Sequence, residues 1–412
     1  MTQRLNSWVT SANSNDTDFP LNNLPYGVFT GPGRTAHCGV AIGDQILDVT
    51  TAEAAGLLTL AEKNVFAGGS WNAFMALADW SAFRGNLISA LTEGSALQSK
   101  LQAHLVAQSG VQMLMPFTVA EFTDFYAGRH HATNVGTMFR GPENALPPNW
   151  LHIPIGYNGR ASSVVVSGND ITRPYGQLKG PNDKLPRFAP SARFDMELEM
   201  GAIVGKPSTG RISVDQADDN IFGYVLLNDW SARDIQAWEY QPLGPFQAKA
   251  TATTISPWIV TKEALEPFRT STPEREFELL EHLKDSGPML YDIALDVVLT
   301  TASGSDTTIA RTNYKEMYYS AAQQLAHHTS SGCPMRTGDL LGSGTISGPD
   351  KGSLGSMLEL SWGGKEPLTL TNGEMRSFLE DGDQITLSGA AIGRDYRIGF
   401  GECTGKILAC SN

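Results

Sequence analysis

Short apolar runs bounded by turn residues dominate the chain beyond about residue 118, and few helical segments lie between them. Runs of this kind are typical of β-strands. A doubly wound parallel sheet needs a helix after nearly every strand, so the pattern argues against that fold. The 412 residues also include 42 Gly and 22 Pro, which fit many turns better than a helical bundle. The sequence therefore predicts a mainly β protein with some α-helix.

The first hundred or so residues have a different texture. Strand-like runs occupy residues 26–29, 38–42 and 46–49, and apolar residues with helical spacing follow over 74–97 and 101–106. Pro116 ends this pattern, because proline cannot continue a helix. We therefore expect two domains, residues 1–117 and 118–412, with the clearest helix of the second over residues 314–328.

Charge and composition exclude several classes of function. The chain has 30 Lys and Arg against 43 Asp and Glu, a net charge of −13, whereas proteins that bind nucleic acid or anionic membranes show a basic excess. No apolar run reaches the roughly 18–20 residues of a membrane span, and no apolar signal segment opens the chain. The four cysteines form no Cys-x-x-Cys pair. We expect a cytoplasmic protein without nucleic-acid or membrane partners.

An acidic strand is predicted over residues 194–200 (FDMELEM), where every second residue is apolar. Asp195, Glu197 and Glu199 then share one face, each about 6–7 Å from the next. On the pattern alone, a solvated face of an edge strand is the favoured interpretation. The alternative is a site for Mg²⁺ or Ca²⁺, because carboxylate oxygens suit these cations and a cation relieves the repulsion.

A further acidic residue, Asp229, follows the apolar run 225–227 and Asn228, and precedes Trp230. An isolated buried charge is costly, so a buried Asp229 requires a partner. The alternative is an Asx cap at a strand end, which the helix-like start of residues 231–236 keeps open.

Two adjacent histidines, His130 and His131, lie in residues 124–134 (DFYAGRHHATN), with Arg140 close behind. Neither their spacing nor a nearby cysteine supports a zinc site. If Asp124 and the two glutamates bind a cation, His131 can instead act as a general base, since the ordinary pKa of histidine lies near neutral pH.

Other catalytic signatures are missing from the sequence. Residues 342–348 (GSGTISG) are rich in glycine but lack the spacing of a dinucleotide fingerprint or a P-loop. There is no Gly-x-Ser-x-Gly elbow and no His-Glu-x-x-His helix. A nucleotide cofactor, a serine hydrolase and a zinc protease therefore have no support.

Taken together, several of these segments resemble the fumarylacetoacetate hydrolase family. The matching stretches are residues 124–136 (DFYAGRHHATNVG), 157–163 (YNGRASS), 195–200 (DMELEM), 228–236 (NDWSARDIQ), 242–249 (PLGPFQAK), 344–348 (GTISG), 355–362 (GSMLELSW) and 396–401 (YRIGFG). Similarity extends from the Ser7–Trp8 segment to near the C-terminus. That coverage makes the match more specific than the acidic strand, which the wider superfamily shares.

The resemblance implies a fold and an activity. The fold would be a small N-terminal β-barrel like an SH3 domain and a large C-terminal mixed β-roll domain, assembled as a homodimer. The activity would be metal-dependent hydrolysis of the carbon–carbon bond of 4-fumarylacetoacetate to fumarate and acetoacetate. This reaction is the last step of tyrosine and phenylalanine catabolism through homogentisate.

The resemblance also implies site residues, by their positions in the matching motifs. The ligands of a Ca²⁺ or Mg²⁺ ion would be Asp124, Glu197, Glu199 and Asp229, with Lys249 and Thr253 beside the cation. His131 would be the general base and Glu359 its partner. Catalytic donors would be Arg140, Gln236 and Lys249. The substrate would contact Tyr126, Arg140, Tyr157, Gln236, Tyr240 and Thr345.

Two alternatives stay open at this point. One is another enzyme of the same superfamily, an acylpyruvate (2,4-diketo acid) hydrolase or a hydratase–decarboxylase, which shares the carboxylate metal site but usually lacks the His131 cluster and the N-terminal domain. The other is a calcium-stabilised binding module without catalysis. The combination of His131, Glu359 and Lys249 argues against that module, because calcium binding alone requires no base.

Overall fold

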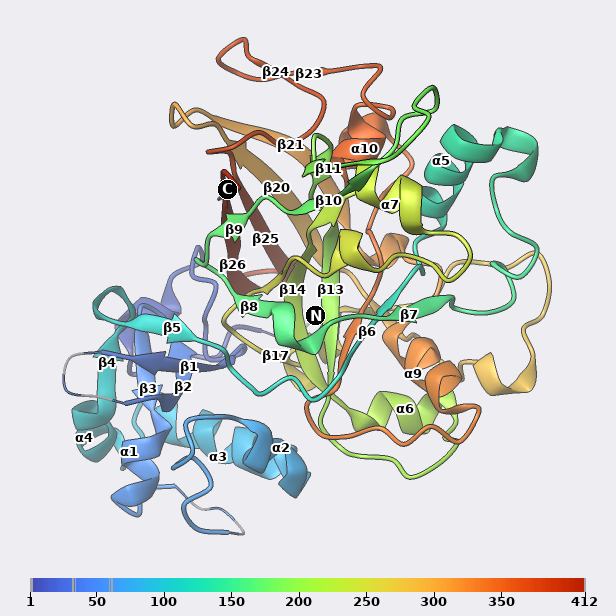
Figure 1. Cartoon of the computed structure of the whole chain (residues 1–412). Coiled ribbons are helices and arrows are strands. Elements are labelled where there is room, and N and C mark those ends of the chain that lie inside the picture. Colours follow the sequence, from blue (N-terminus) through green and yellow to red (C-terminus); the bar gives the residue numbers. More distant parts are fainter. Residues whose placement is uncertain (1–2, 32, 34, 59, 61, 411–412) are drawn as a thin grey trace.

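Three larger β-sheets, four two-stranded sheets and a set of short helices make up the described structure, a computed structural model that describes residues 3–31, 33, 35–58, 60 and 62–410 (Figure 1). Strands outnumber helices along most of the chain, so the expected class, mainly β with some helix, is confirmed. Within the described part, no helix is both long enough and apolar enough to cross a membrane.

The N-terminal part contains a five-stranded antiparallel sheet in the order β4-β3-β2-β1-β5. Its strands are β1 (Tyr26–Thr30), β2 (His37–Ile42), β3 (Gln45–Asp48), β4 (Leu105–Ala107) and β5 (Gln112–Leu114). The accompanying helices are α1 (Val49–Ala54), α2 (Asn72–Leu77), α3 (Trp80–Leu91) and α4 (Gln98–Leu101). The three expected strands are confirmed, except that Val49 already belongs to α1, because the Asp48 carboxylate accepts a hydrogen bond from Thr51 N at 3.0 Å and caps that helix.

The middle of the molecule is an eight-stranded sheet in the order β7-β6-β22-β13-β14-β16-β8, with β17 also paired to β14. Its strands are β6 (Phe122–Phe125), β7 (Gly156–Asn158), β8 (Val164–Val166), β13 (Leu198–Val204), β14 (Ile221–Asp229), β16 (Thr253–Ile255), β17 (Val260–Thr261) and β22 (Leu340–Gly342). β13 and β14 run antiparallel side by side through the centre (Figure 1). All their residues are buried, which explains their nearly continuous apolar sequences.

Both faces of this central sheet are covered. Along β14, Tyr224 and Leu226 belong to the large C-terminal core, whereas Val225 and Leu227 pack with the N-terminal helices and strands. This alternation follows from the two-residue period of a strand. The N-terminal part is therefore docked on the back of the sheet that carries the acidic residues.

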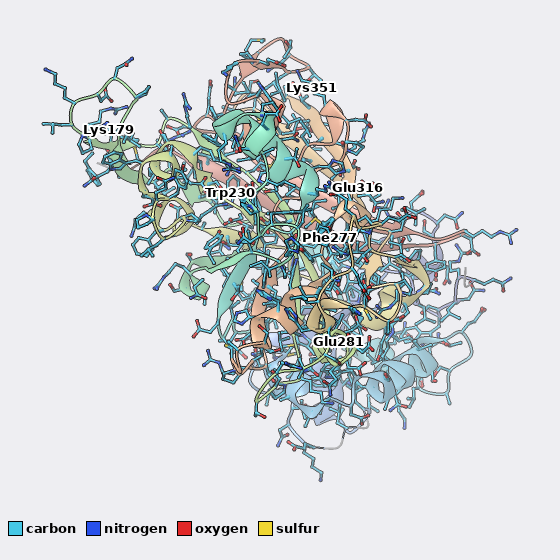
Figure 2. The ribbon with its side chains drawn as sticks, turned by 90° about the vertical axis from the view of Figure 1, so that its right-hand side faces the viewer. Lys179, Trp230, Phe277, Glu281, Glu316 and Lys351 are labelled. Atoms are coloured by element: carbon cyan, nitrogen blue, oxygen red, sulfur yellow. The ribbon has the colours of Figure 1, made fainter. Side chains whose placement is uncertain are left out.

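A second five-stranded sheet, in the order β21-β20-β25-β26-β9, completes the C-terminal part. Its strands are β9 (Ile171–Thr172), β20 (Ala294–Thr300), β21 (Asp306–Asn313), β25 (Gln384–Ile392) and β26 (Arg397–Leu408). Small two-stranded pairs are β10 (Tyr175–Leu178) with β11 (Arg187–Pro190), β12 (Phe194–Asp195) with β15 (Ser231–Ala232), β18 (Arg269–Thr270) with β19 (Leu290–Tyr291), and β23 (Leu368–Thr369) with β24 (Met375–Arg376). The β10–β11 hairpin, which carries Lys179, projects from the body (Figure 2).

The α-helices of the C-terminal part are short and lie at the sheet edges and ends. They are α5 (Arg129–Arg140), α6 (Val214–Asn220), α7 (Arg233–Glu239), α8 (Lys262–Leu265), α9 (Ala321–Thr329) and α10 (Met357–Leu360). Of these, α5, α7 and α10 carry the side chains that surround the acidic residues.

Three helix predictions are wrong in their bounds. Residues 101–106 form a 3₁₀ turn followed by β4. The segment 74–97 is divided because Ala78 adopts a left-handed φ of 56° between α2 and α3. The helix expected over 314–328 begins only at Ala321, since Ser320 and Gln323 form a reciprocal capping box there.

Candidate active site

Three buried carboxylates converge at the ends of neighbouring strands. Asp124 is on β6, Glu199 on β13 and Asp229 on β14, and one oxygen of each lies within 4.8 Å of the others. Gly342 of β22 lies between the first two strands, opposite Asp124 in the register. A Cβ at Gly342 would meet Asp124 Oδ1 at 2.4 Å and Glu199 Oε2 at 3.0 Å. Glycine at this position therefore leaves room for the carboxylates to face each other.

The donor set of this cluster fits a hard divalent cation. Asp124 Oδ1 and Glu199 Oε1 are buried and have no hydrogen-bond partner among the described residues. Burial raises the pKa of Asp124 to about 8, with the Asp229 charge adding to the rise. Burial, followed by the charges of Asp124 and Asp229, also raises the pKa of Glu199 well above its ordinary value. Oxygen ligands without other partners, in a site that resists ionisation, are what a bound Ca²⁺ or Mg²⁺ would stabilise.

Lys249 and Tyr157 lie beside the cluster. Tyr157 Oη is 2.9 Å from Asp124 Oδ2 and 3.1 Å from Asp229 Oδ2. Lys249 Nζ donates to Asp229 Oδ2 at 2.5 Å and also pairs with Glu197. Thr253 Oγ1 is 3.4 Å from Asp229 Oδ1. The pairing with Lys249 confirms the expectation that a buried Asp229 requires a partner. The Asx-cap alternative is wrong, because the Asp229 carboxylate bonds with the side chains of Lys249, Tyr157 and Thr253, and Ala232 is the N-cap residue of α7.

Glu197 has a different environment from Glu199, two residues away. Its oxygens accept hydrogen bonds from Arg233 Nη2 at 2.7 Å, Thr345 Oγ1 at 2.7 Å and Ser231 Oγ at 3.1 Å, besides the pair with Lys249. Burial acts to raise the pKa of Glu197, but Arg233, Lys249 and His131 outweigh it and hold the pKa well below its usual range. Glu197 is therefore an ionised carboxylate whose oxygens already have partners.

Asp195, Glu197 and Glu199 are all buried, so the solvated edge-strand interpretation is wrong. The continuous strand expected there is interrupted between β12 and β13. The paired sheet strands, Arg233 at the start of α7 and the segment that carries Gly344 cover this acidic face, which a local sequence pattern does not reveal.

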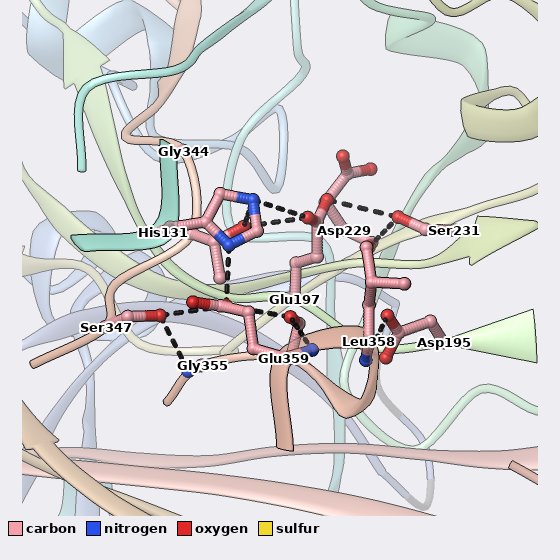
Figure 3. Close-up of polar contacts among 12 residues, drawn as sticks. His131, Asp195, Glu197, Asp229, Ser231, Gly344, Ser347, Gly355, Leu358 and Glu359 are labelled. Atoms are coloured by element: carbon pink, nitrogen blue, oxygen red, sulfur yellow. Dashed lines mark hydrogen bonds and ion pairs between the residues drawn. The ribbon is translucent and has the colours of Figure 1, made fainter. Parts of the chain in front are cut away.

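A histidine–glutamate pair lies next to Glu197 (Figure 3). His131 Nδ1 is 2.6 Å from Glu359 Oε2, and His131 Nε2 is 3.2 Å from Thr345 Oγ1 and 3.5 Å from Glu197 Oε1. Burial acts to raise the pKa of Glu359, but His131 and the other donors outweigh it and lower that pKa. His130, by contrast, is partly exposed and lies 3.8 Å from Glu316. The structure thus directs only one of the two histidines toward the acidic residues.

A cavity of about 500 Å³ opens onto these groups. Its lining includes most residues predicted to contact substrate or metal, namely Asp124, Tyr126, His131, Arg140, Tyr157, Glu197, Glu199, Gln236, Tyr240, Lys249 and Thr345. Asp229, Thr253 and Glu359 lie behind that lining. Arg140 is exposed at the end of α5 and donates to the backbone carbonyls of Asn144 and Ala145.

Several polar residues of the site were missed by the sequence analysis. Arg233, at the start of α7, lines the cavity and binds both Asp195 and Glu197. Asn134 Nδ2 and Ser347 Oγ donate to Glu359, each at 2.9 Å. An arginine four residues after a buried aspartate was a readable signal for Arg233, whereas the contacts to Glu359 depend on the tertiary fold.

Two models of protein-family regions match most of this chain. A model of the fumarylacetoacetate hydrolase C-terminal region matches residues 121–407, and one of the fumarylacetoacetase N-terminal region matches residues 22–116. The chain is 50% identical to a fumarylacetoacetase of Caenorhabditis elegans over 409 residues, 95% of this chain and 97% of that protein. It is 48% identical to the human fumarylacetoacetase over 405 residues, again 95% and 97% of the two chains.

Solved structures show the same fold at lower sequence similarity. A fumarylacetoacetate hydrolase from Exiguobacterium antarcticum superposes with a TM-score of 0.53 at 17% identity, covering 94% of this chain and 99% of that one. A maleylpyruvate hydrolase from Sphingobium superposes with a TM-score of 0.51 at 15% identity, covering 94% and 100%.

Proposed function

Since the chain belongs to the fumarylacetoacetate hydrolase family, we propose that it hydrolyses the carbon–carbon bond of 4-fumarylacetoacetate, releasing fumarate and acetoacetate. The observation that carries the proposal is that one cavity joins an acidic cluster suited to a cation with a buried His131–Glu359 pair. Cleavage between two carbonyl groups requires a water nucleophile, a base and stabilisation of a carbanion leaving group, and these groups supply such chemistry.

Ca²⁺ or Mg²⁺ is the proposed cofactor. The proposed ligands are Asp124, Glu199 and Asp229, together with Glu197, and Lys249 and Thr253 would lie beside the ion. A divalent cation supplies Lewis-acid stabilisation of negative charge on the oxygens of a β-diketone. Among these ligands, Asp124 and Glu199 are the better supported, because each has a buried oxygen without a partner.

His131 is proposed to accept the proton of the attacking water at Nε2. A carboxylate can only accept, so Glu359 fixes the other imidazole proton on Nδ1 and leaves Nε2 free as the base. Ser356 Oγ also donates to Glu359, at 2.8 Å, and joins Asn134 and Ser347 in holding that carboxylate. The imidazolium that forms would be stabilised by the ionised Glu359.

Four other side chains are proposed to bind the substrate and the charge that develops on it. Lys249 and Gln236 line the cavity as donors, and Arg233 is a further cation there. Arg140 lies at the exposed end of the cavity and provides positive charge for a substrate carboxylate. Tyr126, Tyr157, Tyr240 and Thr345 would contact the substrate from the remaining sides.

We also propose that the N-terminal sheet forms an SH3-like barrel and that the chain divides into domains of residues 1–117 and 118–412. The protein is further proposed to form a homodimer and to be located in the cytoplasm. The short antiparallel strands β1 to β5 support the first of these.

Fumarate release from 4-fumarylacetoacetate, measured with metal present and after chelation, tests the function. We expect rapid release that chelation abolishes and that Ca²⁺ or Mg²⁺ restores. Efficient cleavage of acylpyruvates without fumarate release would instead favour the related 2,4-diketo acid hydrolases. Metal binding with no turnover of either substrate would favour a binding module.

A further inference from the structure

Asp195 is a buried carboxylate that lies behind the cavity and does not line it. Four donors surround it. Oδ1 accepts from the backbone N–H groups of Met196 at 2.8 Å and Met357 at 2.7 Å. Oδ2 accepts from Leu358 N at 3.0 Å and from Arg233 Nε at 2.8 Å. Each oxygen therefore has two donors, and none of these four partners is an acceptor.

These donors belong to two different parts of the site. Met357 and Leu358 open α10, the helix that carries Glu359. Figure 3 shows Asp195 beside Leu358, the residue before Glu359. Arg233 opens α7, and its Nη2 holds Glu197. Asp195 is thus the single side chain, within the described residues, that accepts hydrogen bonds from both the first turn of α10 and the Arg233 guanidinium.

We infer that Asp195 is a positioning residue, which fixes the helix of Glu359, and through Glu359 the His131 imidazole, relative to the Arg233–Glu197 pair. This inference rests on the proposed role of His131 and Glu359 in hydrolysis. His131 Nε2 lies 3.5 Å from Glu197 Oε1, so a small rotation of α10 changes where the base faces the cavity. Displacement of a catalytic group by about 1 Å can reduce turnover by about a hundredfold.

Asparagine cannot replace Asp195 in this arrangement. Its amide has one oxygen and one NH₂ group, so two of the four donors would face another donor. The resulting repulsion falls either on Met196 N and Met357 N or on Leu358 N and Arg233 Nε, according to the orientation of the amide. Asp195→Asn therefore disturbs the geometry without changing any group that lines the cavity.

A matched control is available elsewhere in the fold. Asp383 is also fully buried, accepts from Arg376 Nε at 3.0 Å and from Glu380 N at 2.9 Å, and lies away from the cavity lining. Asp383→Asn removes a comparable buried carboxylate, so it reports the effect of lost stability alone.

The test measures kcat and KM for 4-fumarylacetoacetate with the metal-loaded protein. Asp195→Asn should lower kcat roughly 10–100-fold while KM changes less than about threefold, because Asp195 does not touch the substrate. Asp383→Asn should leave kcat within about threefold of the wild-type value. In a Glu359→Gln background, Asp195→Asn should lower kcat further by less than about fivefold, since both changes act through the same base.

The outcomes separate this inference from the proposed function. Wild-type protein that releases no fumarate overturns the proposed function and this inference with it. Suppose that the wild-type protein is active. If the falls in kcat from Asp195→Asn and Glu359→Gln then multiply fully in the double variant, or if Asp195→Asn raises KM alone, only the positioning role is overturned. If Asp195→Asn does not fold, Asp195→Glu, which keeps the charge and displaces the carboxylate, should show the same selective fall in kcat, and unchanged turnover there would also overturn the inference.

Discussion

Cation binding at the Asp124–Glu199–Asp229 cluster should release protons. Burial raises the pKa of Asp124 to about 8, and the Asp229 charge adds to the rise. Burial, followed by the charges of Asp124 and Asp229, places the pKa of Glu199 well above its ordinary value. Asp124 is therefore largely protonated at neutral pH without a cation, and Glu199 keeps its proton to a higher pH than an ordinary glutamate does. An ion that binds their oxygens must displace those protons.

The structure sets the expected number of protons. A group with a pKa near 8 is protonated in roughly nine molecules of ten at pH 7, so Asp124 contributes about one proton, and the raised pKa of Glu199 adds to the release. Asp229 contributes less, because Lys249 Nζ at 2.5 Å opposes the rise that burial causes in its pKa. Since at least about one proton competes with each cation, the apparent Kd should fall at least about tenfold from pH 6 to pH 7.

Isothermal titration calorimetry measures this proton release. Metal-free protein is titrated with CaCl₂ at neutral pH, once in Pipes and once in Tris, and the difference between the two apparent binding enthalpies gives the number of protons released. Asp124→Asn has one fewer proton to lose and should release about one proton fewer for each ion that it still binds. Release of less than about half a proton by the wild-type protein would refute the reasoning, because the carboxyl groups would then be ionised before binding.

Four further outcomes are expected. The raised pKa of Asp124 stabilises the metal-free fold fully below about pH 4, and this contribution is lost as the pH rises through about 8. The Tm of the metal-free protein should therefore fall over that range and recover when calcium is added. Glu199→Gln should lower the calcium or magnesium found by elemental analysis, and stoichiometric zinc would contradict the oxygen-ligand site. His131→Ala should reduce turnover roughly 10²–10⁴-fold with the metal retained, while His130→Ala has a milder effect, and the reverse result would identify the other histidine as the base. Gly342→Ala should weaken metal retention, because its Cβ would meet Asp124 Oδ1 at 2.4 Å, and full retention would show that the carboxylates can move apart.

The sequence predicted elements well where local patterns determine them. The strands around residues 26–29 and 38–42 have alternating or apolar runs between turn residues, and they occur as expected. The helix was predicted to start at residue 314, earlier than it does, because the apolar periodicity extends back through Tyr318 to Tyr314. These two residues are buried by tertiary packing and do not belong to the helix. The Ser320–Gln323 capping box was the local signal for its true start.

The sequence indicated which residues form the candidate site, but not which side chains pair with one another in it. The alternation of FDMELEM identified three acidic residues on one side of a strand, yet it could not show whether solvent or protein covers them. The structure buries all three and gives them different partners, because Arg233 and Lys249 come from elements that follow β14. Such pairings depend on strand register and loop path, which a single sequence does not specify.

The division of charge within this buried cluster accounts for where a cation and an anionic substrate can both be accommodated. Arg233 and Lys249 neutralise the side of the site formed by Asp195 and Glu197. Within the part of the chain that the structure describes, Asp124 and Glu199 receive no such cation in direct contact, and each keeps an oxygen without a partner. A divalent ion is therefore most favourable on that second side, where it relieves carboxylate repulsion without competing with a lysine or arginine for the same oxygens. Arg140 lines the same cavity and is exposed, so its charge stays available for the substrate carboxylate that it is proposed to bind.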